Sequence, residues 1–173
     1  MKKIGSILII ILILCIGVGL AARSIAFPIK NKSEIQKYSK EYKIKPEFVA
    51  AAIRLGPIYN GKDKKYGDFK LQAKAAKAIA KEMGLKDFNE KDLENKDLNI
   101  KIGTWFLAKY YKEKGLEYAL AKFGGINYAY VNDSSRKSDK ENKERAEMIY
   151  NDKQYVNKIK NNMKIYKILY PTL

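Results

Sequence analysis

The chain has 173 residues, with 35 Lys and Arg against 19 Asp and Glu, which gives a formal charge of +16 at pH 7. It contains no histidine, which excludes His-based catalytic triads and removes the commonest metal ligand. Its one cysteine, Cys15, lies inside an apolar run, so residues 27–173 have no disulfide and no thiol chemistry. We therefore expect no metal site and no cofactor.

The N-terminal segment differs most from the rest of the sequence. Residues 4–22 run for 19 positions without a charge, between Lys3 and Arg23. A helix of that length approaches the roughly 30 Å hydrocarbon core of a bilayer, and the basic start places the N-terminus inside. Residues 1–26 are predicted to be a single-pass anchor in a bacterial cell membrane, with the domain outside. The alternative is a signal peptide cut near Ala26, which would release a secreted protein.

Residues 27–173 form one domain by length. They carry 32 Lys and Arg, because Lys2, Lys3 and Arg23 precede them, against all 19 acids, a net charge of +13. Outside a membrane, a field of that sign attracts anionic lipids or acidic wall polymers rather than nucleic acid. The alternative is that most of these lysines only keep the domain soluble.

Helical spacing and punctuation predict an all-α domain, α+β at most. Ser33 and Gln36 form a capping-box pattern that indicates the start of a first helix. Pro46 fits the first turn of a second helix, which Gly56-Pro57 ends. Residues 58–69 show no periodicity and predict a loop.

The sequence predicts further helices after this loop and shows no convincing strand. Gly84 ends one of them, Gly115 the next, and a charged connector between them has room for one short helical turn. The predicted helical ranges are 71–83, 97–115, 116–123, 140–151 and 155–170.

The helix beginning near Asp97 carries the most specific motif of the chain, Asn99-Ile100-Lys101-Ile102-Gly103-Thr104-Trp105-Phe106-Leu107. It is similar to the Asn-Ile-x-x-Gly-x-aromatic-x-Leu helix of soluble lytic transglycosylases, enzymes that cut the glycan of peptidoglycan. Other segments resemble that family in the same order: residues 38–54, 78–84, 119–123 and 155–170. The resemblance covers most of residues 33–170. It implies a lysozyme-like helical domain over residues 27–173 that acts on peptidoglycan glycan strands.

The resemblance also implies a catalytic acid that this chain lacks. Glycoside cleavage needs a proton for the leaving oxygen, and the family supplies it from a Glu that directly follows an Ile-Arg-x sequence. In this chain Ile53-Arg54-Leu55 is followed by Gly56 and Pro57, so the acid position holds no side chain. We expect a domain that binds glycan strands without cutting them.

Two carboxylates of the loop are candidates for a substitute acid. Lysines surround Asp63 and would lower its pKa, which is the wrong direction for a proton donor. Asp68 lies beside Tyr66 and Phe69 and is the better candidate. With Asp68 as acid, the protein would be an active lytic transglycosylase that cleaves the MurNAc–GlcNAc bond. The alternative for Asp68 is a solvated turn residue beside Gly67.

Substrate binding can persist where catalysis is lost. The resemblance places three side chains in the cleft: Gln72, at the end of the counterpart of the family's Gly-Leu-Met-Gln strip, then Phe123 and Tyr155. Among the 13 tyrosines, Tyr66 is a further candidate, although tyrosines are also ordinary core residues. The family's Asn-Ala-Gly turn becomes Gly124-Gly125-Ile126 and loses its Asn. A third reading is a basic envelope adaptor with a vestigial cleft, which binds anionic lipid or wall polymer.

Overall fold

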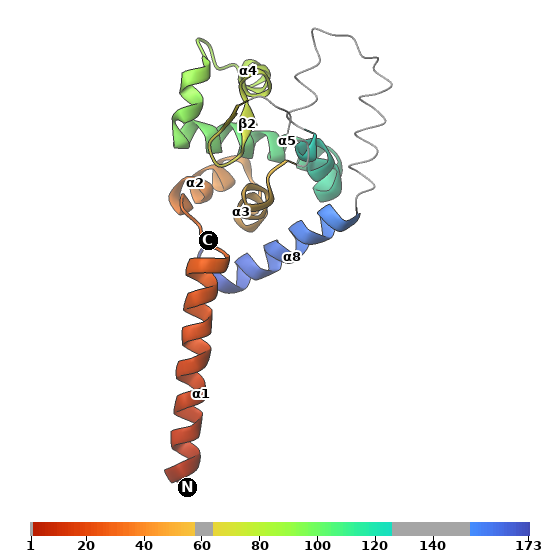
Figure 1. Cartoon of the computed structure of the whole chain (residues 1–173). Coiled ribbons are helices and arrows are strands. Elements are labelled where there is room, and N and C mark those ends of the chain that lie inside the picture. Colours follow the sequence, from red (N-terminus) through yellow and green to blue (C-terminus); the bar gives the residue numbers. More distant parts are fainter. Residues whose placement is uncertain (1, 58–63, 126–152) are drawn as a thin grey trace.

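The computed structural model describes residues 2–57, 64–125 and 153–173. Its N-terminal part is a projecting rod made of helix α1 (Lys2–Ala21) and the π-helical turn η1 (Ala22–Ala26) (Figure 1). The span Ile7–Ala26 has a mean hydropathy of 2.6, and none of it is buried against the domain. This is the apolar helix expected from the sequence, and it is consistent with a membrane anchor or a signal sequence.

The rest of the described chain is mostly helical, as predicted, with one small antiparallel hairpin. Its elements are α2 (Lys32–Tyr42), α3 (Pro46–Leu55), β1 (Lys65–Tyr66), β2 (Leu71–Gln72), α4 (Ala73–Glu82), the 3₁₀ helix η2 (Glu90–Glu94), α5 (Lys96–Gly124) and α8 (Lys153–Leu169). In the hairpin, Lys65 pairs with Gln72 and Tyr66 with Leu71. The sequence predicts a loop over residues 58–69 and a helix from Leu71, so the start of that helix is wrong: residues 71 and 72 form β2, and α4 begins at Ala73. Strands of two residues leave no alternating pattern to detect.

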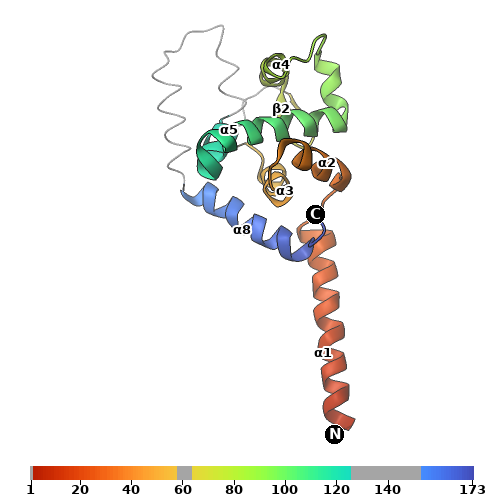
Figure 2. The same cartoon turned by 180° about the vertical axis from the view of Figure 1, so that it is seen from behind.

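Helix α3 lies in the middle of the domain, between α8 and the pair formed by α2 and α5 (Figure 2). Pro46 stands in its first turn, as predicted, where a missing N–H leaves no helical hydrogen bond unmade. Phe48, Val49, Ala51 and Ala52 are all buried. Contacts with α8 on one side and with α2 and α5 on the other hold α3 in place.

The start of α2 differs from the prediction. The helix begins at Lys32 after Asn31, and no side chain caps it. The Ser33 hydroxyl donates to Glu34 instead, and Gln36 Nε2 donates to the Thr172 carbonyl at 2.6 Å. The capping box is therefore wrong, because Ser33 bonds its neighbour and Gln36 has a tertiary partner at the C-terminus.

Two predicted helix breaks are confirmed. Gly84 follows α4 with φ +73°, and Leu85 N donates to Ala80 O at 2.9 Å, which satisfies a carbonyl at the helix end. Gly115, with φ +84°, interrupts α5 at the point where one predicted helix ends and the next begins. The helix expected over residues 140–151 lies outside the described residues.

The C-terminus returns to the end of the apolar N-terminal helix (Figure 1). The Tyr170 hydroxyl lies 2.9 Å from the Arg23 carbonyl and 2.8 Å from the Phe27 carbonyl, both of which accept from it. The Arg23 guanidinium lies over the Tyr170 ring, 4.4 Å from its centroid. These contacts fix the last turn of α8 beside η1.

Candidate functional site

The end of α3 is the place where the family resemblance expects a catalytic acid. Gly56 N closes the helix on Ala52 O at 2.8 Å, and the residue then turns to φ +69° and ψ −179°. That combination is essentially restricted to glycine. The Gly56 carbonyl accepts a hydrogen bond from the Tyr155 hydroxyl at 3.1 Å, so α8 holds this turn from the opposite side. Position 56 therefore contributes backbone alone, in a geometry that disfavours any side chain.

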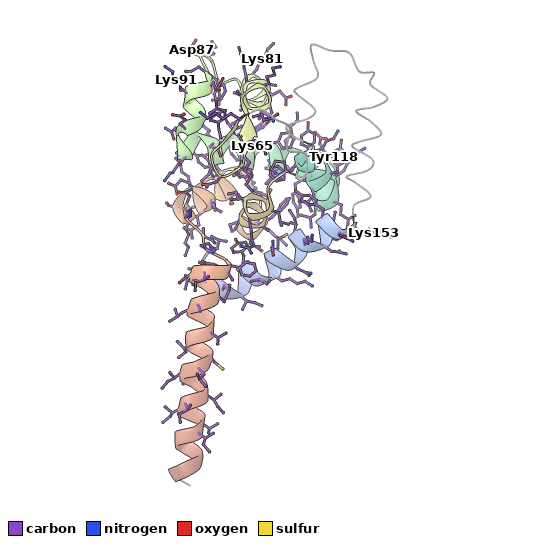
Figure 3. The ribbon with its side chains drawn as sticks, in the orientation of Figure 1. Lys65, Lys81, Asp87, Lys91, Tyr118 and Lys153 are labelled. Atoms are coloured by element: carbon purple, nitrogen blue, oxygen red, sulfur yellow. The ribbon has the colours of Figure 1, made fainter. Side chains whose placement is uncertain are left out.

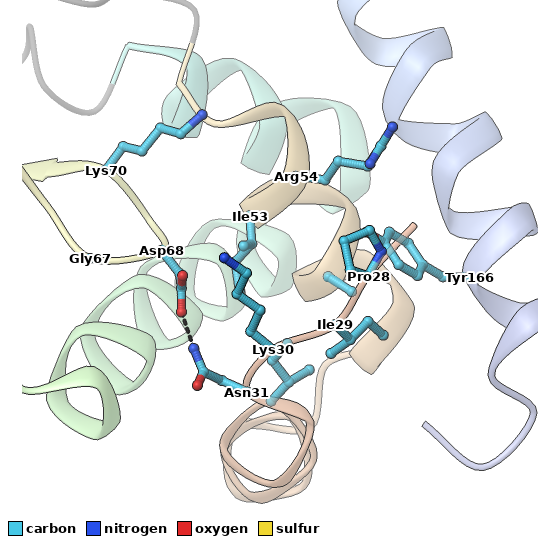
Figure 4. Close-up of a pocket in the computed structure, with 12 residues that line it drawn as sticks. Pro28, Ile29, Lys30, Asn31, Ile53, Arg54, Gly67, Asp68, Lys70 and Tyr166 are labelled. Atoms are coloured by element: carbon cyan, nitrogen blue, oxygen red, sulfur yellow. Dashed lines mark hydrogen bonds between the residues drawn. The ribbon is translucent and has the colours of Figure 1, made fainter. Parts of the chain in front are cut away.

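The side chain of Lys70 covers Gly56. A Cβ at position 56 would lie 3.0 Å from Lys70 Cδ and 3.1 Å from Lys70 Nζ. Figure 4 shows Lys70 extending from the hairpin turn to the chain that follows α3. An ammonium group thus lies where the mechanism of the family needs a carboxylic acid in an apolar pocket. Lysine loses its proton near pH 10.4 and is a poor general acid at neutral pH.

The hairpin that carries Lys70 is fixed to α5 by the motif Asn99-x-x-x-Gly103. Asn99 Oδ1 accepts from Phe69 N at 3.1 Å, and Asn99 Nδ2 donates to Tyr66 O at 3.0 Å. A Cβ at Gly103 would lie 2.2 Å from Phe69 Cγ, so only glycine leaves room for that ring. Both residues of the motif therefore have a structural task, which is to position the hairpin opposite the end of α3.

The predicted binding residues are buried, and none of them is among the residues that line the pocket beside α3. Gln72, Phe123, Tyr155 and Tyr66 have exposed fractions of 1%, 0%, 7% and 5%. Phe123 meets Phe69 edge to face, with 5.7 Å between ring centroids. The Tyr66 hydroxyl donates to Glu90 on η2, so this ring is tied to the side of the hairpin away from α3. Their roles in binding stay predictions, and Asp63 lies outside the described residues.

Asp68 lines a pocket of about 350 Å³ between the hairpin turn, α3 and residues 28–31, the segment that follows η1 (Figure 4). Its carboxylate accepts a hydrogen bond from the Asn31 side chain. In Figure 4 Asp68 turns toward Asn31, whereas Lys70 of the same turn reaches the end of α3. Asp68, the candidate for a substitute acid, is thus engaged with Asn31 rather than with the end of α3.

Positive side chains dominate the pocket around Asp68. Lys30, Arg54 and Lys70 contribute to its lining, against the single carboxylate. The Arg54 guanidinium lies 4.2 Å above the centroid of Phe27. Burial raises the pKa of Tyr166, and the nearby Arg54 charge opposes part of that rise. The pocket thus has an apolar body with cations around it, which suits a polar or anionic ligand better than a cationic one.

Sequence reasoning missed two residues of this region. Lys70 is separated from Gly56 by the whole loop, and no local pattern indicates that its side chain folds back onto α3. The sequence gives no signal for Asn31 either, because the capping pattern that it shows at this helix start is Ser33 with Gln36. Asn31 does precede α2, but its side-chain amide bonds Asp68 instead. Only the tertiary arrangement reveals either contact.

Within the described part of the chain, no three His, Cys, Asp or Glu residues lie close enough to hold a metal ion. A scan against protein-family models finds no family that matches the chain, and a search of curated proteins finds no match either.

Proposed function

We propose that this protein is a membrane-anchored, extracytoplasmic domain, similar to soluble lytic transglycosylases, that binds peptidoglycan glycan strands without cutting them. The observation that carries the proposal is the end of α3. Gly56 supplies no acid there, Tyr155 bonds its carbonyl, and the Lys70 side chain covers it.

The resemblance to the family is supported by contacts that explain why its motif contains Asn and Gly. Asn99 bonds two backbone groups of the hairpin, and Gly103 makes room for Phe69. Tyr155, the counterpart of the tyrosine before Val in the family's closing helix, reaches the residue at the acid position. Segments that resemble the family in sequence are therefore in contact around one site.

The loss of cleavage is supported by chemistry. A general acid for glycoside cleavage needs a carboxyl group held protonated by an apolar environment. The described region instead offers a glycine, a lysine, and an aspartate that is hydrogen-bonded to Asn31. Recognition of sugars needs only concave surface, hydrogen-bonding groups and aromatic walls.

Retention of the anchor is supported by the contacts of Tyr170. Its hydroxyl bonds the carbonyls of Arg23 and Phe27, which lie on either side of the proposed cleavage point near Ala26. Cleavage there would remove the contact with Arg23. Mass spectrometry of the N-terminal peptide of the membrane-purified protein tests this: recovery of residues before Ala26 is expected, and a start just after Ala26 would assign a secreted protein.

The function is tested with the full chain in detergent and purified peptidoglycan. We expect the protein to sediment with the glycan and to release no 1,6-anhydro-muropeptides. Cellulose serves as the control polysaccharide, and binding that persists at high salt separates glycan recognition from simple charge attraction. Release of anhydro products, abolished by Asp68→Asn, would instead identify an active transglycosylase with a relocated acid. Loss of all binding at high salt would favour a basic adaptor.

A further inference from the structure

Exposed apolar surface is concentrated where the anchor meets the domain. Beyond α1, the large apolar side chains that the described chain leaves exposed are Ile25, at 81%, and Ile168, at 77%. Ile25 belongs to η1, and Ile168 lies in the last turn of α8. Ile25 belongs to the apolar span Ile7–Ala26, so within the described domain Ile168 is the large apolar side chain left exposed outside that span.

Lysines flank Ile168 on the same side of α8. Lys164 lies three residues before Lys167 and four before Ile168, so it shares a helix face with both, and all three are exposed. The opposite face buries Tyr155, Val156, Ile159 and Tyr166 in the domain. Helix α8 contains no Asp or Glu. We call Lys164, Lys167 and Ile168 the juxtamembrane face.

The position of this face follows from the anchor. The apolar span ends at Ala26, and its 20 residues match the thickness of the hydrocarbon core. Tyr170 bonds the Arg23 and Phe27 carbonyls, so the last turn of α8 is held at that same level. In Figure 3 the other end of α8, marked by Lys153, lies farther from the anchor. The final turns of the helix are therefore the part that reaches lipid headgroups.

We propose that the juxtamembrane face docks on the surface of an anionic phospholipid bilayer. Ile168 enters the boundary between headgroups and acyl chains, while Lys164 and Lys167 contact lipid phosphates. A basic helix face with an apolar residue at headgroup depth is the pattern of interfacial helices. Two attachments, the span and this face, then fix the tilt of the domain above the membrane. This proposal does not depend on glycan binding.

The test uses the full chain in lipid nanodiscs, with a nitroxide label at Ile168→Cys in a Cys15→Ser background. The measured quantity is the accessibility of the label to oxygen relative to a water-soluble nickel complex. We expect immersion of the label in discs that contain phosphatidylglycerol, and less in phosphatidylcholine alone. A label at Lys91→Cys, at the far end of the domain in Figure 3, should stay in water in both.

Charge removal isolates the role of the lysines. Lys164→Gln with Lys167→Gln should shift the docking equilibrium away from the bilayer by about fivefold per lysine. The matched pair Lys77→Gln with Lys81→Gln, exposed on α4 and equal in charge change, should leave immersion unchanged. Equal loss in both pairs would overturn the proposal in favour of general charge attraction. A label at 168 that stays water-exposed with phosphatidylglycerol, or magnetic coupling between labels on two copies, would overturn it as well.

Discussion

The hairpin meets α5 and α3 through contacts that differ in kind. Toward α5, Asn99 bonds two buried backbone groups, and Gly103 accepts the Phe69 ring with no space to spare. Toward α3, Gly56 meets only the long side chain of Lys70. The first contact tolerates few other residues, whereas a flexible lysine can move aside. The contact with α5 therefore restricts which side chains can occupy positions 99 and 103. At position 56, where the family resemblance expects catalysis, the restriction comes from the backbone conformation alone.

The largest expected loss of stability is at the contact between Gly103 and Phe69. Gly103→Ala places a methyl group 2.2 Å from Phe69 Cγ inside a buried helix, so the ring or the helix must move. Overpacking of this kind destabilises by about 3 kcal/mol. Urea denaturation of the full chain in detergent measures it, with Gly17→Ala as the control, because Gly17 lies within helix α1 and a Cβ there meets nothing within 4 Å. Equal loss in the two variants would contradict the tight fit.

A second effect concerns the hydrogen bonds of the same contact. Asn99→Leu leaves Phe69 N and Tyr66 O without their buried partner, which we expect to lower the free energy of unfolding by about 2 kcal/mol. The control is Asn95→Ala, which removes the exposed cap bond to Leu98 N, at about 1 kcal/mol. A loss at Asn99 no larger than the loss at Asn95 would mean that the hairpin finds other partners.

At the contact between Gly56 and Lys70, we expect backbone strain rather than side-chain packing to determine the loss of stability. Gly56→Ala imposes a side chain on φ +69° and ψ −179°, which costs about 1–3 kcal/mol, and pushes against Lys70. Lys70→Leu alone should change stability by less than about 1 kcal/mol, because the side chain is exposed. If Lys70→Leu destabilised as much as Asn99→Leu, the two contacts would not differ in the way described.

Substitutions at position 56 also test the proposed loss of catalysis. A Glu at position 56 would lie against the Lys70 ammonium, which would keep the new carboxylate ionised and unable to donate a proton. We therefore expect Gly56→Glu to release no anhydro-muropeptides from peptidoglycan, and Gly56→Glu with Lys70→Leu to release some. Activity in the single variant would show that Lys70 leaves the position freely.

Features that depend on neighbouring residues could be predicted from the sequence, whereas features that depend on tertiary contacts could not. The period of apolar residues predicts the described helices, and Pro46, Gly84 and Gly115 mark their boundaries, because such signals act within a few residues. The hairpin has too few residues to show a pattern, and its attachment depends on Asn99, thirty residues away from Phe69. The glycine at the position where the family resemblance expects an acid is visible in the sequence, but the lysine over it is not, since that contact exists only after folding.

The smallest expected effect on stability is at Asp97, in the first turn of α5. The Tyr38 hydroxyl donates to its carboxylate, and Lys37 Nζ pairs with the same group at 3.0 Å. The Tyr38 hydrogen bond, together with Lys37, lowers the pKa of Asp97 in the folded protein. A lowered folded pKa adds stability above the unfolded value, near pH 3.9, and that stability is lost as the pH falls through the lowered pKa.

Asp97→Asn should therefore destabilise at pH 7 and converge with the natural chain under acid conditions. The difference should not exceed about 1 kcal/mol, because the Asp97 side chain is 47% exposed and solvent screens the ion pair. Urea denaturation at about pH 7 and about pH 3 measures it, with Glu94→Gln as the control, whose partner Lys64 is 3.7 Å away and whose side chain is 69% exposed. A constant difference between the two chains at both pH values would show that Asp97 acts through packing rather than through its charge.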